Sequence, residues 1–132
     1  MAGLNRVNPP SLAAPSGFSH AVVASGTTVF LAGQTGMTAD GTIVDGGVAA
    51  QFEQALANLL TALDAAGGRP DQLASLTIYI VDVDDYRAHA RELGAVWKRL
   101  VGSDYPATAG IGVARLWDRA ALVEVQGFAV LD

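Results

Sequence analysis

The chain has 132 residues, a formal net charge of −5 at pH 7 and a sequence pI of about 4.7. Non-specific affinity for nucleic acid comes from clustered Lys and Arg, so this acidic balance argues against a nucleic-acid partner and a nuclease role. There is no cysteine, which excludes disulfides and cysteine-ligated metals. The only histidines are His20 and His89, too few for a histidine-rich zinc site, and we expect no bound metal.

Length and hydropathy predict a single domain spanning residues 1–132. A chain of this size buries roughly two-thirds of its unfolded surface, which suffices for a core without disulfides or metals. No segment approaches about 18 consecutive apolar residues, and Met1–Pro15 lacks the apolar region of a signal peptide, so we expect a soluble cytoplasmic protein without a membrane partner. The 51% hydrophobic content exceeds the need of one small core and predicts a homo-oligomer that covers the surplus.

The N-terminal part predicts an irregular lead-in followed by a β-hairpin. Segments His20–Ala24 and Thr28–Gln34 are rich in β-formers, and a turn centred on Gly26 separates them. Phe18 and His20 lie two residues apart before the first strand, so both are predicted to point to the same side. A core or interface role for Phe18 and a structural role for His20 are the alternatives to ligand binding.

The middle of the chain predicts a loop, two helices and a strand between them. Residues 35–47 carry Asp-Gly turn signals and indicate a loop with a small hairpin. Apolar residues at helical spacing predict a helix over Val48–Leu63, ended by Gly67 and Gly68. Leu73–Val81 is apolar on both faces, as a central strand is, and residues 82–100 predict a second helix with acids capping its start.

A strand is predicted after Pro106. Alternation along this strand would place Thr108 and Gly110 on one face and Arg115 on the other. The face with Thr108 and Gly110 carries only small side chains or none. Glycine within a strand often marks the close approach of a ligand or another backbone. A tightly packed strand interface without a ligand is the alternative.

Glu124 is the only acid in the apolar strand predicted over residues 121–131. Carboxylates are rarely buried unpaired, so Glu124 is expected to face water, a partner or a lined cavity. This makes it the best catalytic candidate. A solvent-facing position on an edge strand is the alternative.

The order of strands and helices predicts an α+β fold, with a sheet that carries both helices on one face. The other face must then be covered from elsewhere, which again points to an oligomer.

Four segments carry a resemblance to a known family. The pattern Pro-Ala-x-x-x-Ile-x-Val-Ala-x-Leu, six residues, then Val-Glu-Val resembles the C-terminal signature of the reactive-intermediate deaminase (Rid, or YjgF-like) family. Segment 17–21, Gly-Phe-Ser-His-Ala, resembles that family's Pro-Tyr-Ser-Gln-Ala, and the segment ending in Gly33-Gln34 resembles its Ser-Gly-Gln strand end. Residues 48–67 are similar to its first helix. No one of these short segments identifies the family alone, but the four of them in the family's order along the chain are a specific signature of it.

The resemblance implies the chorismate-mutase-like (YjgF-like) fold and a homotrimer with a barrel-like core, with ligand clefts between subunits. It also implies a reaction in which water hydrolyses an imine or enamine to a carbonyl compound and ammonia, with no cofactor. Glu124 matches the family glutamate that places the water. The expected substrate-binding residues are Phe18, His20, Gly33, Thr108 and Gly110.

The chain departs from the family pattern at several of these positions. Thr108 stands where the family carries the arginine that holds the substrate carboxylate, Phe18 replaces its tyrosine, and Gly110 stands where many members have cysteine. The asparagine of the second helix is also absent, since the region is Ala88-His89-Ala90. A charge-assisted hydrogen bond contributes about 1.5–3 kcal/mol. Loss of a bidentate arginine should therefore lower the affinity for a 2-imino carboxylate by roughly a hundredfold or more.

Two functions follow for this arginine-less branch. The first is an imine or enamine deaminase acting on a small-molecule substrate other than the standard 2-imino acids. In that case Glu124 acts as base through water, Thr108 and His20 orient the substrate, and the Gly110 region supplies backbone contacts. The second is a non-catalytic trimer that binds a small metabolite or a protein in the same clefts.

Overall fold

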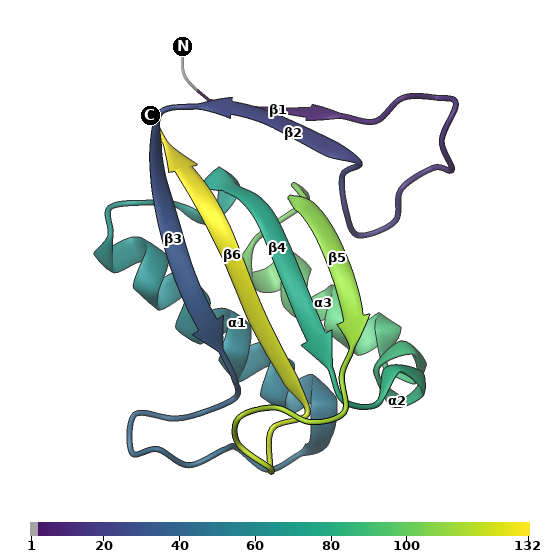
Figure 1. Cartoon of the computed structure of the whole chain (residues 1–132), viewed down its shortest axis with the longest axis vertical. Helices are drawn as coiled ribbons and strands as arrows, with labels where there is room; N and C mark the ends of the chain where they lie inside the picture. The colour runs from purple at the N-terminus through teal and green to yellow at the C-terminus, as the bar shows by residue number, and fades with distance from the viewer. Residues whose placement is uncertain (1–2) are drawn as a thin grey trace.

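A four-stranded mixed sheet with helices on one face forms the body of the structure (Figure 1). The computed structural model describes residues 3–132. Across the sheet the strand order is β3 (Thr27–Gln34), β6 (Val123–Leu131), β4 (Leu73–Ile80) and β5 (Ala107–Gly112). Strand β6 is antiparallel to both of its neighbours, whereas β5 is parallel to β4. The α+β class predicted from the order of elements is confirmed.

The core lies between this sheet and three helices, α1 (Gly47–Ala65), α2 (Val83–Ala88) and α3 (Ala90–Leu100). Leu56, Leu59 and Leu63 follow the helical spacing and are fully buried on the sheet-facing side of α1. Val123 and Val125 are fully buried on the helix-facing side of β6, as alternation along a strand requires. Each such side chain stabilises the fold by about 1.5–3 kcal/mol.

The predicted second helix is divided in two at His89. The His89 Nδ1–H donates to the Asp85 carbonyl at 2.8 Å, which is the acceptor that the His89 backbone N–H would use in a continuous helix. That backbone N–H bonds instead to the Tyr86 carbonyl at 3.1 Å. Asp82 caps the start of α2 by accepting from the Asp85 N–H at 3.0 Å. The predicted acidic cap is confirmed, and the single helix is corrected to two.

The predicted hairpin between the first two apolar segments is wrong. Strand β2 (Ala21–Ser25) pairs with β1 (Gly3–Val7), which lies in the predicted irregular lead-in, while β3 pairs with β6. Gly26 joins β2 to β3 with φ of 141°, and a β-carbon there would collide with the Leu131 carbonyl oxygen. The chain therefore passes close to the end of β6 and moves from one sheet into the other instead of reversing.

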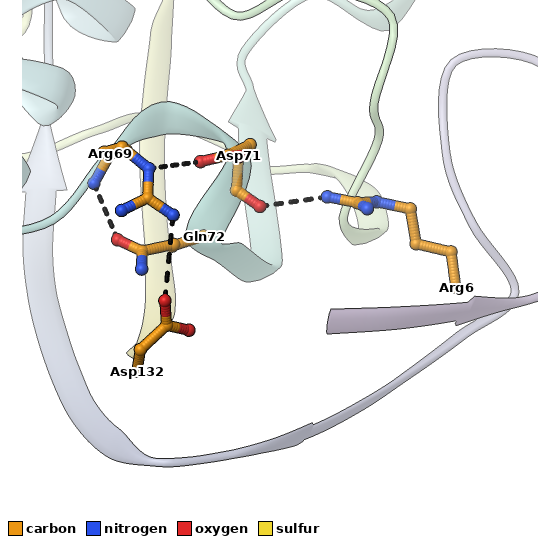
Figure 2. Close-up of polar contacts among 5 residues, drawn as sticks. All are labelled: Arg6, Arg69, Asp71, Gln72 and Asp132. Atoms are coloured by element: carbon orange, nitrogen blue, oxygen red, sulfur yellow. Dashed lines mark hydrogen bonds and ion pairs between the residues drawn. The ribbon is translucent and has the colours of Figure 1, made fainter. Parts of the chain in front are cut away.

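The β1–β2 ribbon crosses one end of the four-stranded sheet and is held there by polar contacts (Figures 1 and 2). Arg6 on β1 donates to the Asp71 carbonyl at 3.0 Å. Asp71 belongs to a single 3₁₀ turn, Pro70–Gln72, and its carboxylate pairs with Arg69 at 3.3 Å. Arg69 also lies 4.0 Å from the Asp132 carboxylate (Figure 2). Such exposed ion pairs contribute about 0–1 kcal/mol each, so they fix positions more than they stabilise the fold.

The face of the sheet opposite the helices is open and partly apolar. Phe30 on β3 is 77% exposed and Phe128 on β6 is 39% exposed, and their rings pack edge to face at 5.3 Å. Contiguous exposed apolar side chains of this kind mark interaction surfaces. Within the described residues, the helices are too short or too polar to cross a bilayer.

Candidate functional site

Strand β5 carries Thr108 and Gly110 on its helix-facing side. Thr108 pairs with Leu76 and Gly110 with Ile78, and Leu76 is buried in the core between sheet and helices. The prediction that these two residues share one sparse face of a strand is therefore confirmed.

The strand ends at Gly112, earlier than predicted. Arg115 lies in the following loop, where its guanidinium donates to the carbonyls of Leu116 and Trp117 at 3.1 and 3.2 Å. We predicted that Arg115 lies on the strand face opposite Thr108, and this prediction is wrong because position 115 is not in the strand. The hydrogen bonds of the Arg115 guanidinium are to carbonyls of its own loop.

Residues 18–20 lie beside the start of β5. Buried Ser19 donates its N–H to the Pro106 carbonyl at 3.0 Å and its hydroxyl to the Tyr105 carbonyl at 2.7 Å. This anchor places Phe18 and His20 together, as predicted, with their rings edge to face at 5.0 Å.

A cavity of about 370 Å³, here called the hydroxyl cavity, lies where this segment meets β4 and β5. Its polar lining side chains are Ser19, His20, Ser75, Thr77 and Thr108. The structure therefore brings three of the predicted binding residues together, since Phe18 also lines this cavity.

Ser19, His20 and Thr108, three of the five polar side chains of the hydroxyl cavity, already have protein partners. The Thr108 hydroxyl donates to the Pro106 carbonyl at 2.8 Å, so its oxygen remains available as an acceptor. His20 Nε2 lies 2.8 Å from the Ala13 carbonyl, which fixes the proton on Nε2 and leaves Nδ1 of a neutral ring as an acceptor. A ligand here would be met by two acceptors at Thr108 and His20.

A second cavity of about 430 Å³, here called the aromatic cavity, adjoins the first on the helix side of the sheet. The two share Phe18, Leu76 and Thr108. Five aromatic side chains contribute to its lining: Phe18, Phe52, Tyr86, Trp97 and Tyr105. Gly110 also lines it, so the predicted residue stands in this wall.

The aromatic wall is held rigidly. Trp97 stacks on Tyr105 with ring centroids 5.7 Å apart and donates its indole N–H to the Asp104 carbonyl at 3.2 Å. Tyr86 packs edge to face on Phe52 at 6.2 Å. Burial raises the pKa of Tyr86 to about 12, so its phenol is protonated at physiological pH.

Glu124 lies on the opposite, open face of the sheet. It pairs with Tyr79 on β4, and it alternates along β6 with the buried Val123 and Val125. Strand β6 lies inside the sheet, so the edge-strand alternative for Glu124 is wrong. Among residues 3–132, no Lys or Arg side chain pairs with its carboxylate.

Gly33 adjoins Glu124 at the end of β3. An ideal β-carbon placed on Gly33 would contact the Glu124 carboxylate oxygen and lie 2.9 Å from its Cδ atom. The predicted site residues thus form two groups on opposite faces of the sheet. Phe18, His20, Thr108 and Gly110 line the cavities, while Gly33 and Glu124 lie on the open face.

Sequence reasoning missed the helical side of the aromatic cavity. Tyr86 and Trp97 belong to an apolar helical stripe that predicts only core packing. The available signal was Gly94 in the middle of that helix, where glycine disfavours the helical conformation. In the described part of the chain, no three His, Asp or Glu side chains are grouped so that they could hold a metal ion.

Comparisons with known proteins agree with the fold. The family model described as "Endoribonuclease L-PSP" matches residues 9–131. The 2-iminobutanoate/2-iminopropanoate deaminase of Capra hircus is 34% identical over 114 residues, covering 86% of this chain and 79% of that protein. The human protein of the same name is 31% identical over 114 residues, which again cover 86% of this chain and 79% of that protein. A Yersinia pestis protein of unknown function, described as a conserved Rid family member, superposes with a TM-score of 0.87 at 34% identity, covering 98% of this chain and 99% of that one.

Proposed function

The chain belongs to the Rid (YjgF-like) family, and from this premise we propose that it hydrolyses a reactive imine or enamine to a carbonyl compound and ammonia. Its substrate differs from the standard 2-imino acids. Two observations support this proposal: Glu124 makes no ion pair to a Lys or Arg within residues 3–132, and two cavities without Lys, Arg, Asp or Glu in their lining lie at Thr108 on the other face of the sheet.

In the proposed reaction, water adds to the carbon of a protonated C=N bond and gives up a proton to the Glu124 carboxylate, which leaves a neutral carbinolamine. Glu124 then returns that proton to the nitrogen, the C–N bond breaks and ammonia leaves, while the hydroxyl oxygen releases its proton to water and becomes the carbonyl. An enamine first takes a proton on carbon to become the imine. A positioned acid–base group of this kind contributes about two to four decades of rate.

Assembly is part of the proposal, because Glu124 and Thr108 lie on opposite faces of one chain's sheet. We propose a homotrimer in which the open faces pack together and Glu124 of one subunit faces the Thr108 cavities of the next. The exposed pair Phe30 and Phe128 supports burial of the open face. Each cleft would then need two subunits to be complete.

The uncharged lining supports a substrate that differs from a 2-imino acid. Within residues 3–132, neither cavity has a Lys, Arg, Asp or Glu side chain in its lining. A carboxylate entering such a site would lose its hydration without gaining an ion pair to a Lys or Arg. The deaminases with which this chain shares about a third of its residues are named for 2-imino acids, so we expect a difference in substrate within the family.

Two other functions compete with this one. The family model is described as an endoribonuclease, but the net charge of −5 and the uncharged cavities do not favour an RNA backbone. A non-catalytic binding module would use the same cavities without needing Glu124, and it is favoured by Thr108 at the position where the family resemblance implies an arginine.

Ammonia release from a panel of freshly generated imines tests the proposal, with semicarbazide trapping the free imine. We expect at least one neutral imine to be hydrolysed faster than in buffer. Glu124→Gln should lower that rate by roughly two to four decades while keeping the fold. Gln126→Asn, two residues along the same face, is the matched control and should retain most of the rate. Equal rates in wild type and Glu124→Gln would remove this residue from the mechanism.

A further inference from the structure

We propose that the aromatic cavity binds an uncharged, ring-bearing group of the ligand, and that Gly94 and Gly110 determine this specificity by leaving the space open. The inference rests on the proposed function only for the identity of the reacting group. Recognition of the ring follows from the cavity itself.

The chemistry of the wall favours an apolar ring. Small-molecule sites enclose about 300–1,000 Å³ and are lined mainly by apolar and aromatic side chains, and this cavity lies at the lower end of that range. It has room for one ring rather than a nucleotide or a large cofactor. Phe18, Tyr86 and Tyr105 keep part of their surface exposed in this wall, and a second ring can pack against them edge to face or offset. The buried Phe52 and Trp97 support Tyr86 and Tyr105 from behind.

Gly94 lies in the middle of α3, where glycine costs about 1 kcal/mol of stability relative to alanine. Glycine is not required there by the backbone or by packing. A β-carbon at this position would meet no atom within 4 Å, and the helical φ is negative. Gly94 lines the aromatic cavity, so a larger side chain at this position would fill part of the cavity.

Gly110 has the same character on the facing strand. A β-carbon there would lie 3.6 Å from Ile80 Cδ1, which is an ordinary van der Waals contact. Gly110 lies inside β5, where glycine weakens a strand. Two glycines that packing does not demand therefore stand on opposite sides of one cavity, Gly94 on the helix and Gly110 on the sheet.

Three hydroxyl groups in the wall remain available to the ligand. Ser16, Tyr86 and Tyr105 line the cavity, and their hydroxyls make no hydrogen bond to any residue in the part of the chain that the structure describes. The Trp97 indole N–H is already used by the Asp104 carbonyl. The ligand that best fits is a neutral ring carrying a hydrogen-bond acceptor, such as a carbonyl or imine nitrogen.

Three probe compounds separate the features of this ligand. Acetophenone carries a ring and a neutral carbonyl, benzoylformate carries the same ring and carbonyl with a carboxylate, and pyruvate carries the carboxylate without a ring. Binding to the full-length chain is measured by isothermal titration calorimetry and by saturation-transfer NMR. We expect acetophenone to bind at least about tenfold more tightly than benzoylformate, because the carboxylate finds no cation. Pyruvate should bind most weakly.

Substitution at Gly94 tests the site directly. Gly94→Leu should weaken acetophenone binding by about tenfold or more, because its side chain occupies the space of the ring. Ala95→Leu is the matched control: it adds a side chain to the next exposed position of α3, which lies outside the lining. Gly110→Val fills the cavity from the strand side and serves if Gly94→Leu does not fold.

The results decide the inference separately from the proposed function. Equal affinity for acetophenone in wild type and Gly94→Leu, or tighter binding of benzoylformate than of acetophenone, overturns it. Tight acetophenone binding that is lost in Gly94→Leu and kept in Ala95→Leu supports it. If that binding is found but neither the imine of acetophenone nor any other imine is hydrolysed, the ring site stands and the proposed deaminase activity falls.

Discussion

Gly33 and Glu124 share a space that holds either a carboxylate or a β-carbon, but not both. Gly33 has no positive φ, so its backbone does not require glycine. The close approach of the Glu124 side chain across the sheet provides the reason for glycine at this position. Gly33 is therefore expected to act as a positioning residue for the carboxylate.

Gly33→Ala should displace the Glu124 carboxylate without unfolding the protein, because the atoms in the way belong to the end of a flexible side chain. Misplacing a reacting group by about 1 Å can cost roughly a hundredfold in rate. We expect kcat for imine hydrolysis to fall, with a smaller change in KM and an unchanged melting temperature. Ala32→Ser, the adjacent exposed position, should change neither kcat nor KM. A normal kcat in Gly33→Ala would show that the carboxylate position does not matter.

Thr108→Arg should supply a cation beside the two cavities, to which the carboxylate of a 2-imino acid can bind. A bidentate arginine contributes two charge-assisted hydrogen bonds of about 1.5–3 kcal/mol each, so KM for imines derived from ordinary amino acids should fall by roughly a hundredfold or more. Semicarbazide competition measures this. Thr108→Lys supplies a charge without the planar pair of donors and should gain less. Fast hydrolysis of these imines by the wild type would mean that another cation reaches the site.

Phe30→Glu should disrupt the proposed trimer. It places a charge in the centre of the exposed aromatic pair, and burying that charge in an apolar interface costs several kcal/mol. Native mass spectrometry should show a trimer for the wild type at micromolar concentration and mostly monomer for the variant. Leu12→Glu alters a partly exposed apolar residue in the loop between β1 and β2 and serves as the control. A monomeric wild type would contradict the proposed assembly and the two-subunit cleft.

The break between α2 and α3 should respond to pH. The hydrogen bond to the Asp85 carbonyl, aided by the Asp85 and Glu92 carboxylates, raises the pKa of His89 above its ordinary value of 6.5. A raised folded-state pKa contributes stability that is fully present below the unfolded pKa and is lost as the pH rises through the folded pKa. The loss of stability in His89→Gln should therefore be larger at about pH 5.5 than at about pH 8.5. Denaturant melts at both pH values measure this, and equal losses would refute it.

Local sequence patterns predicted the elements well where one periodicity dominated. The leucines of α1 and the alternation around Glu124 placed both segments correctly. The β1–β2 ribbon was missed because the local sequence of β2 does not show whether it pairs with β1 or with β3. The close approach of Gly26 to Leu131, which accompanies the observed pairing, joins residues more than 100 positions apart in the sequence. The break between α2 and α3 was missed because the His89 side chain, not its backbone N–H, bonds to the Asp85 carbonyl. Helical periodicity does not show such a side-chain hydrogen bond.

The candidate site was predicted less completely, for a geometric reason. Motif spacing along the chain identified Thr108 and Glu124, but it could not show that strand parity and register put them on opposite faces of the sheet. The aromatic cavity was hidden because Trp97 and Tyr86 have the spacing of core residues and only their packing shows that they leave room. The two glycines were the signals for that room.

The position of β6 affects how the chain can fold during synthesis. Strands β3 and β4 are not hydrogen-bonded to each other, because β6 lies between them and pairs with both. Strand β6 is also the last of the described strands to emerge from the ribosome. A nascent chain that ends at Leu122 holds the β4–β5 pair and β3 as a single strand without a partner in the sheet. It should remain unfolded and prone to aggregate until residues 123–131 are released. Chaperones that hold nascent chains should therefore matter more for its yield than for proteins whose central strand is made early.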